Sequence, residues 1–245
     1  MGTSKAYGGL KGVPTWSNLS SSVTKAVNDG HPTQDSLRKI MSNAVAHFGG
    51  SNRAYSGGSK TGGRAGVKTA QRLGSFLGNV QNNGFISSLN GLGKGIDIND
   101  VSQAKGIIIE HCANNAGTLD EVAAKAAMRD LLNDIGADAL SINEFGEKFE
   151  SAIKDYGPKE LIVKYFGNYL YEHLATDFYE KLIKEKGIKE TNSFYRDLKE
   201  YIIEQTKTIS ENHDLRSIDW QSRSGQTVIQ ELFRETLIAF EGYED

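Results

Sequence analysis

The stretch closest to a phosphate-binding motif is glycine-rich and reads Gly57-Gly58-Ser59-Lys60-Thr61-Gly62-Gly63-Arg64. A Walker loop needs a glycine five positions before its Gly-Lys-Thr core and a strand that leads into it. Here Ser59 separates Gly58 from Lys60, and the preceding residues lack the pattern of a strand. We therefore expect a basic loop that touches a phosphate backbone or an acidic protein face, and not a nucleotide-binding loop.

The histidines and the cysteine do not have the spacing of a metal or nucleophilic site. Only His111 and Cys112 are adjacent, and their side chains diverge on a helix or a strand. Cys112 follows the apolar run Ile107–Ile109, which indicates a small buried hydrophobe. The sequence thus predicts no catalytic residue, no metal and no cofactor. An enzyme that uses Glu172, His173 and the neighbouring tyrosines remains an alternative.

Basic residues gather in the first part of the chain. Residues 1–96 contain 11 Lys and Arg against 2 acidic residues, whereas the rest of the chain contains 17 basic and 29 acidic residues. Lys60, Arg64, Lys68 and Arg72 recur every four residues, which would align them if one helix carried them all. These four are the candidate contacts to phosphate or nucleic acid, and a nucleic-acid-binding adaptor is the alternative function.

The N-terminus carries a different kind of chemistry. Removal of Met1 leaves Gly2 with a free α-amine, whose pKa is ordinarily near 8. Glycine has no β-carbon to hinder attack, so this amine can accept an acyl group if another enzyme supplies an activated carboxylate. An ordinary disordered chain end is the alternative interpretation.

The opening Met1-Gly2-Thr3-Ser4-Lys5-Ala6-Tyr7-Gly8-Gly9, followed by Val13-Pro14-Thr15-Trp16, resembles the start of the QatB family. A looser similarity follows in the glycine-rich stretch 49–66 and in the helical remainder. Leu10 stands where relatives often have proline, so the detailed conformation of the segment is open. QatB belongs to the bacterial Qat antiphage systems, together with an ATPase, a QueC-like enzyme and a TatD-like nuclease.

The resemblance implies a non-catalytic defence component that works with the QueC-like protein. QueC-type enzymes use ATP to activate a 7-deazaguanine carboxylate, which ammonia then attacks. We expect Gly2 to take the place of ammonia and to acquire a 7-deazaguanine-type amide. The partner would bind the segment through Thr3, Ser4, Tyr7, Gly8, Gly9 and Trp16. Cleavage within the arm or within 49–66, which would expose another glycine, is an alternative source of the acceptor.

For Gly2 to reach a partner enzyme, the N-terminal segment must be flexible and must be attached to a folded domain. Glycines and two prolines predict a flexible arm over 1–32, in which Leu10, Val13 and Trp16 could anchor in a groove on this protein or on another. Residues 33–245 are expected to form one helical domain with a glycine-rich loop at 49–66. A sub-boundary is possible near 97–117.

The body has helical periodicity and no convincing strand pattern. We expect helices over 33–48, 67–92, 118–135, 138–155, 159–186, 191–210 and 224–241, with breaks at the glycines within 67–92. Thr33 and the capping box Thr118–Glu121 are start signals. The stretch 99–115 is compatible with either a helix or a strand. The predicted fold class is an all-α helical bundle.

The expected location is the cytoplasm. No run of residues approaches the roughly 18 apolar positions of a membrane helix, and residues 1–22 lack the apolar core of a signal peptide. A single cysteine fits a reducing compartment, because no internal disulfide can form.

Overall fold

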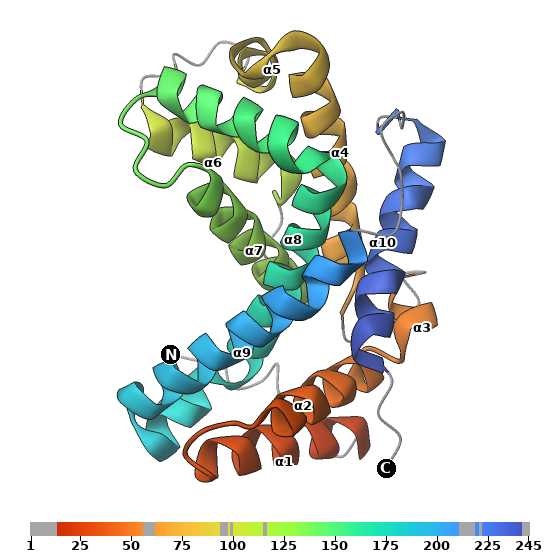
Figure 1. Cartoon of the computed structure of the whole chain (residues 1–245), viewed down its shortest axis with the longest axis vertical. Coiled ribbons are helices and arrows are strands. Elements are labelled where there is room, and N and C mark those ends of the chain that lie inside the picture. Colours follow the sequence, from red (N-terminus) through yellow and green to blue (C-terminus); the bar gives the residue numbers. More distant parts are fainter. Residues whose placement is uncertain are drawn as a thin grey trace.

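The computed structural model of the chain describes residues 14–55, 62–93, 98, 100–114, 117–210, 219–220 and 222–241. All regular structure in these ranges is helical, which confirms the all-α prediction. Figure 1 shows α1 and α2 side by side at one end of the molecule and α5 at the other. The helices are α1 (Pro14–Asn28), α2 (Gln34–His47), α3 (Ser51–Tyr55), α4 (Arg64–Asn83), α5 (Phe85–Leu92), α6 (Val101–Cys112), α7 (Leu119–Ile135), α8 (Ile142–Lys186), α9 (Ile188–Ser210) and α10 (Arg223–Glu241).

Helix starts follow the capping signals in the sequence. The Thr33 side chain accepts a hydrogen bond from the Ser36 backbone amide at the start of α2. At α7, Thr118 and Glu121 form a complete capping box, as predicted. Such side chains satisfy amides that have no partner within the helix. The region 99–115, for which the sequence allows a helix or a strand, contains the helix α6 with Asp100 as its N-cap.

Two expectations about the first 66 residues are wrong. The extended arm does not continue to residue 32, because Pro14–Asn28 form α1. This helix buries Leu19, Val23 and Ala26, which lie at helical spacing, and Pro14 is tolerated in its first turn. The loop expected at 49–66 is also interrupted, since Ser51–Tyr55 form α3 and α4 begins at Arg64. The expected arm residues 1–13 and loop residues 56–61 lie outside the described part of the chain.

Glycines break the helices at fewer places than expected. Gly74 and Gly78 lie within α4, where they give room to the side chains of Ile229 and Trp220. The break falls at Gly84, where φ is 79° and α5 begins. Helix α8 is interrupted at Gly157, with φ 76° and ψ 159°, directly before Pro158. The predicted boundary between helices 138–155 and 159–186 is therefore a sharp bend.

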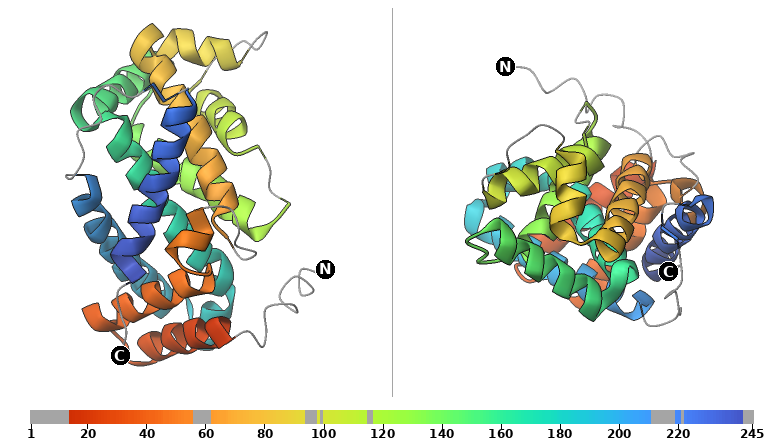
Figure 2. Two further views of the ribbon diagram at one scale, coloured as in Figure 1. Left: turned by 90° about the vertical axis from the view of Figure 1, so that its right-hand side faces the viewer. Right: turned by 90° about the horizontal axis from the view of Figure 1, so that it is seen from above.

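One apolar core connects the helices. It runs from Leu19 in α1 to Phe240 in α10, and α7 and α9 both pack along α8. Figure 2 shows α10 alongside α4 on another side of the bundle. Phe145 and Phe149 are fully buried, as their spacing predicts, whereas Tyr156, expected on the same face, is exposed. No helix within the described ranges is long and apolar enough to cross a membrane.

Candidate functional site: the anchored root of the N-terminal segment

The first turn of α1 is fixed to the body through Trp16. Its indole stacks on the Phe178 ring of α8, with centroids 5.0 Å apart and planes inclined by 10°. The His47 ring at the end of α2 lies 5.4 Å from the same indole, and the Thr15 hydroxyl is 3.4 Å from His47 Nδ1. Stacked aromatic pairs contribute about 0.5–1.5 kcal/mol beyond the area that they bury. The point at which residues 1–13 join the fold is therefore defined.

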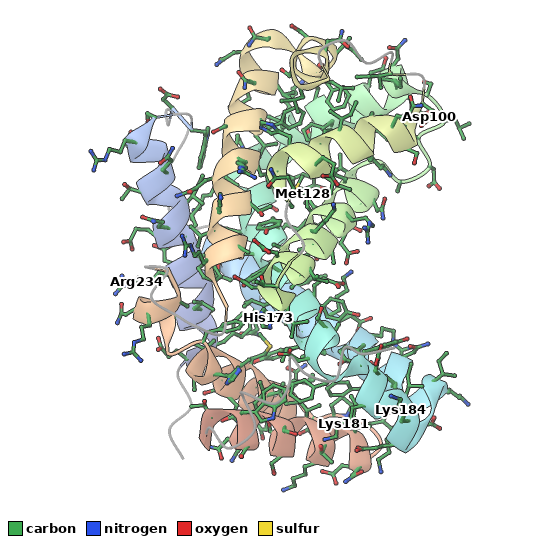
Figure 3. The ribbon with its side chains drawn as sticks, turned by 180° about the vertical axis from the view of Figure 1, so that it is seen from behind. Asp100, Met128, His173, Lys181, Lys184 and Arg234 are labelled. Carbon is green, nitrogen blue, oxygen red and sulfur yellow. The ribbon has the colours of Figure 1, made fainter. Side chains whose placement is uncertain are left out.

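Beneath Trp16 lies a cluster of buried ionisable side chains. His173 Nδ1 is 3.4 Å from an Asp177 carboxylate oxygen, and each side chain is 5% exposed or less. Figure 3 places His173 in the interior of the molecule, where its ring meets Phe48 edge-on. Burial lowers the pKa of His47; Asp177 raises this pKa and His173 lowers it further. A lowered pKa keeps His47 neutral at pH 7.

Gly62 packs against the same cluster. A β-carbon at this position would lie 2.7 Å from Phe48 Cε1 and 2.8 Å from His173 Nε2. Both distances are well below van der Waals contact, so only glycine fits without movement of the rings. The sequence predicts Gly62 in a basic loop, whereas the structure shows it packed between two aromatic side chains.

The next residues are held by a polar contact between three helices. Asp120 of α7 accepts hydrogen bonds from the backbone amides of Gly63, at 3.3 Å, and Ala65, at 2.9 Å. The Tyr169 hydroxyl of α8 donates to Asp120 and accepts from the Gly63 amide at 2.7 Å. Burial, together with the Asp120 charge, raises the pKa of Tyr169 well above its usual value. Asp120 thus serves as a cap for α4 as well as an acidic residue in the first turn of α7.

Of the residues predicted to bind the partner, Trp16 lies within the described part of the chain. Gly2, the predicted acceptor, lies outside the described residues, as do the other predicted contacts, Thr3, Ser4, Tyr7, Gly8 and Gly9. Trp16 is half-buried and contacts its own chain, which agrees with an anchor on this protein.

The predicted basic contacts lie in different surroundings. Lys60 is outside the described residues, and Arg64 and Lys68 are exposed on α4. The Arg72 guanidinium donates to Asn114 Oδ1 at 2.9 Å and to the Cys112 carbonyl at 3.4 Å. Arg72 thus binds the end of α6, where carbonyl groups lack partners within the helix.

His173 and Glu172 do not converge on one site. His173 packs on Phe48 and Asp177, whereas Glu172 lies in the field of Asp130 and Arg129 from α7 and Lys199 from α9. Burial, together with Asp130, raises the Glu172 pKa to about 7, although Lys199 and Arg129 oppose the shift. Among the described residues, no three His, Cys, Asp or Glu side chains could hold a metal ion. Cys112 is buried, as predicted, and burial raises its pKa to about 12.

Sequence reasoning missed His47 and Phe178 as the residues that hold Trp16. The spacing of Phe178 predicts an apolar helix face, but nothing in it indicates which ring this side chain meets. His47 and His173 are far apart in the sequence, so only the tertiary fold brings the end of α2 near His173. The helical spacing of Trp16, Leu19 and Val23 could have identified α1.

The fold and the site define an all-α helical bundle in which buried polar side chains cap helices and hold the start of α1. The family model QatB, described as Qat anti-phage system associated protein QatB, matches residues 56–240. The chain belongs to the QatB family and is a component of the Qat antiphage system. Comparison with curated proteins and with solved structures gave no match. The family match includes Gly62, Asp120 and His173, whereas Trp16 and His47 precede it.

Proposed function

We propose that this chain is a non-catalytic Qat component whose N-terminal glycine is modified by a QueC-like partner enzyme. Gly2 is the acceptor, and Thr3, Ser4, Tyr7, Gly8 and Gly9 are read by the partner as an extended peptide. The observation that carries the proposal is the anchored root: Trp16 stacks on Phe178, so the segment before it starts from a fixed point on a packed body.

The chemistry requires an activated acyl group from the partner. The partner uses ATP to activate a 7-deazaguanine carboxylate, and the unprotonated Gly2 amine attacks the carbonyl carbon. A carbon–nitrogen amide bond forms, the bond to the activating group derived from ATP breaks, and the amine nitrogen loses a proton. An α-amine with a pKa near 8 supplies a useful unprotonated fraction at neutral pH.

The length of the segment sets the geometry of the complex. Residues 2–13 span at most roughly 40 Å when fully extended, at about 3.4 Å per residue. The partner's reaction centre must then lie within that distance of the start of α1. Gly8, Gly9 and Gly12 give the backbone access to conformations that other residues avoid.

The test is intact-mass and peptide mass spectrometry of the chain from cells with and without the QueC-like protein. We expect the N-terminal peptide to gain the mass of the 7-deazaguanine carboxylic acid less one water, and to do so only in cells that contain the partner. An N-terminal peptide of unchanged mass in both samples would refute modification at this site. Modification at a glycine exposed by cleavage would instead identify the internal acceptor.

Two variants test whether Gly2 is the acceptor. Gly2→Glu is expected to retain Met1, because a large second residue prevents its removal, and to stay unmodified. Gly2→Ala keeps a free amine and adds one methyl group, and we expect slower modification. Equal modification of the unaltered chain and both variants would show that Gly2 is not the acceptor.

Binding to the partner is tested by co-purification of the full chain and of a chain that lacks residues 1–12. This deletion retains Trp16 and the whole of α1, so loss of binding would be due to the N-terminal segment. Trp16→Ala in the full chain is the complementary variant, which keeps the segment and removes its anchor. We expect the deletion to abolish modification and Trp16→Ala to slow it; full binding and normal modification of Trp16→Ala would argue against a role for the anchor.

A further inference from the structure

A pocket of about 470 Å³ lies at the bend of α8, between the ends of α7 and α9. Its volume is within the range of roughly 300–1,000 Å³ that ligand-binding pockets have. The apolar part of its lining comes from Ile135 of α7, Ala152, Leu161 and Val163 of α8, and Ile203 of α9. These side chains come from both arms of α8, so the pocket depends on the bend.

The bend leaves a large side chain without cover. Gly157 adopts φ 76°, and α8 changes direction directly after Tyr156 (Figure 1). Tyr156 lines the pocket and is 59% exposed, although Phe149 and Ile153 earlier on this arm are buried. Tyrosine is enriched among the residues that contribute most to protein–protein binding, and such residues cluster in well-packed pockets.

Three lysines and three carboxylates line the pocket, namely Lys148, Lys164, Lys207, Asp134, Asp155 and Glu160, and they are unevenly neutralised. Lys164 pairs with Asp134 at 3.3 Å, and Lys148 donates to the Ala137 carbonyl and lies 3.6 Å from Glu144. Within the described part of the chain, Asp155 and Glu160 form no ion pair, although the Ser151 hydroxyl donates to Asp155 at 3.0 Å. These two carboxylates flank Tyr156 along the chain, at the bend.

We propose that this pocket is a docking site for another protein of the same defence system, which inserts an apolar side chain and places an arginine or lysine against Asp155 and Glu160. The apolar floor and Tyr156 supply contact area, and the two acidic residues select a basic neighbour. A guanidinium suits this position because it can bind carboxylates through two hydrogen bonds.

This surface is separate from the root of the N-terminal segment. Phe178, which holds Trp16, lies 21 residues beyond Gly157 on α8, or roughly 30 Å at 1.5 Å per residue. Binding at the pocket and modification of Gly2 can therefore be measured independently.

The test uses the full-length chain and each of the other Qat proteins, purified and immobilised one at a time. Tyr156→Ser removes the exposed ring, and Glu160→Lys reverses one of the two charges. The matched controls are Ile188→Ser and Glu190→Lys, both at exposed positions at the start of α9. Circular dichroism and thermal unfolding of all four variants show whether each is folded.

We expect Tyr156→Ser to weaken binding to one Qat protein by roughly tenfold or more, as truncation of an interface tyrosine does. Glu160→Lys should also weaken it, with a larger effect at low salt, because screening reduces charge interactions at high salt. The control variants should bind as the unaltered chain does. Since Glu160→Lys keeps Tyr156, it tests the same surface if Tyr156→Ser does not fold.

Three results would overturn the docking proposal. The first is unchanged affinity of both pocket variants, and the second is an equal loss of affinity in the Ile188→Ser control. The third is that no Qat protein binds the unaltered chain. Gly2 modification is measured on the same variants by mass spectrometry, so failure of the docking proposal leaves the proposed acceptor standing.

Discussion

At the scale of single residues, the chain contains buried ionisable groups with opposite effects on stability. His47 is kept neutral beside His173 and Asp177, whereas Glu172 lies near Asp130 and has its pKa raised to about 7. A lowered histidine pKa and a raised carboxyl pKa oppose each other in the dependence of stability on pH. Their contributions can therefore be separated by substituting one at a time.

We predict that Glu172→Gln stabilises the protein at pH 8. The folded state prefers the protonated carboxyl. The free energy of unfolding of the wild type therefore falls as the pH rises from the unfolded-state pKa of Glu172, 4.5, through its folded-state pKa of about 7. After discounting for partial exposure, the expected gain at pH 8 is about 1 kcal/mol, with little effect at pH 4.5. Urea unfolding at both pH values checks this, and an equal effect at both would contradict a titration-based cause.

We predict that His47 destabilises the protein in acid. Its folded pKa lies below the unfolded value of 6.5, so its neutral form stabilises the fold above pH 6.5, and this stability is lost as pH falls through the folded pKa. His47→Gln should reduce the slope of unfolding free energy against pH between about 7 and 5. His31→Gln is the control, because His31 is exposed; an identical slope in the wild type and His47→Gln would refute the prediction.

At the scale of elements, helix ends are tied together by side chains from other helices. Asp120 joins the start of α4 to α7 and α8, and Arg72 of α4 binds the end of α6. Local capping at α2, α6 and α7 is visible in the sequence, because the capping side chain lies within three residues of the amide. The cross-helix contacts have no such local pattern.

We predict that Asp120→Ala destabilises the protein by about 2–3 kcal/mol. Two backbone amides and the buried Tyr169 hydroxyl lose a charged acceptor, and unsatisfied buried groups are costly. Thr118→Ala, which removes the local cap of α7 alone, should cost about 1 kcal/mol. Hydrogen exchange at Gly63 and Ala65 should increase in Asp120→Ala and not in Thr118→Ala; equal exchange in both variants would exclude Asp120 as the cap of α4.

Two glycine substitutions should have opposite effects on the stability of the protein. Gly157 has φ 76° and ψ 159° and no heavy atom within 4 Å of the position that a β-carbon would take, so Gly157→Ala should cost about 1–3 kcal/mol through backbone strain alone. Gly106 is inside α6 with open space at its β-position, so Gly106→Ala should stabilise by about 0.5–1 kcal/mol. Thermal and urea unfolding check both, and destabilisation by Gly106→Ala would show that the argument from space is insufficient.

At the scale of the whole molecule, one core runs from α1 to α10, and two surface features lie at different places on it. The anchored start of α1 serves the proposed modification, and the pocket at the α8 bend serves the proposed docking. The basic character of residues 1–96 and the acidic character of the remainder give the two regions different preferences for partners.

We predict that removal of residues 1–12 changes the free energy of unfolding by less than about 0.5 kcal/mol. Four of these twelve residues are glycine, and the anchor Trp16 is retained, so few apolar contacts can be lost. The same deletion should abolish modification by the partner. A large loss of stability, measured by urea unfolding, would show that the segment belongs to the core of the fold.

The sequence by itself determined the all-α class, the local caps and most of the helix boundaries after residue 33. These features depend on residue spacing within a few turns, and Leu37, Ile40 and Val45 or the Thr118–Glu121 capping box express them directly. The prediction of an extended arm is wrong over Pro14–Asn28, because Pro14 and the serines of α1 have turn-like composition, while the packing of Leu19 and Val23 makes the segment helical.

Only the tertiary structure decided which distant side chains meet. In each of three pairs the partners are more than 50 residues apart in the sequence: Trp16 with Phe178, His47 with His173, and Asp120 with the Gly63 amide. The direction in which α8 turns at Gly157 likewise decides that Tyr156 lies on a pocket and not in the core. Periodicity shows which face of a helix is buried, but the angle at which helices cross determines what that face contacts.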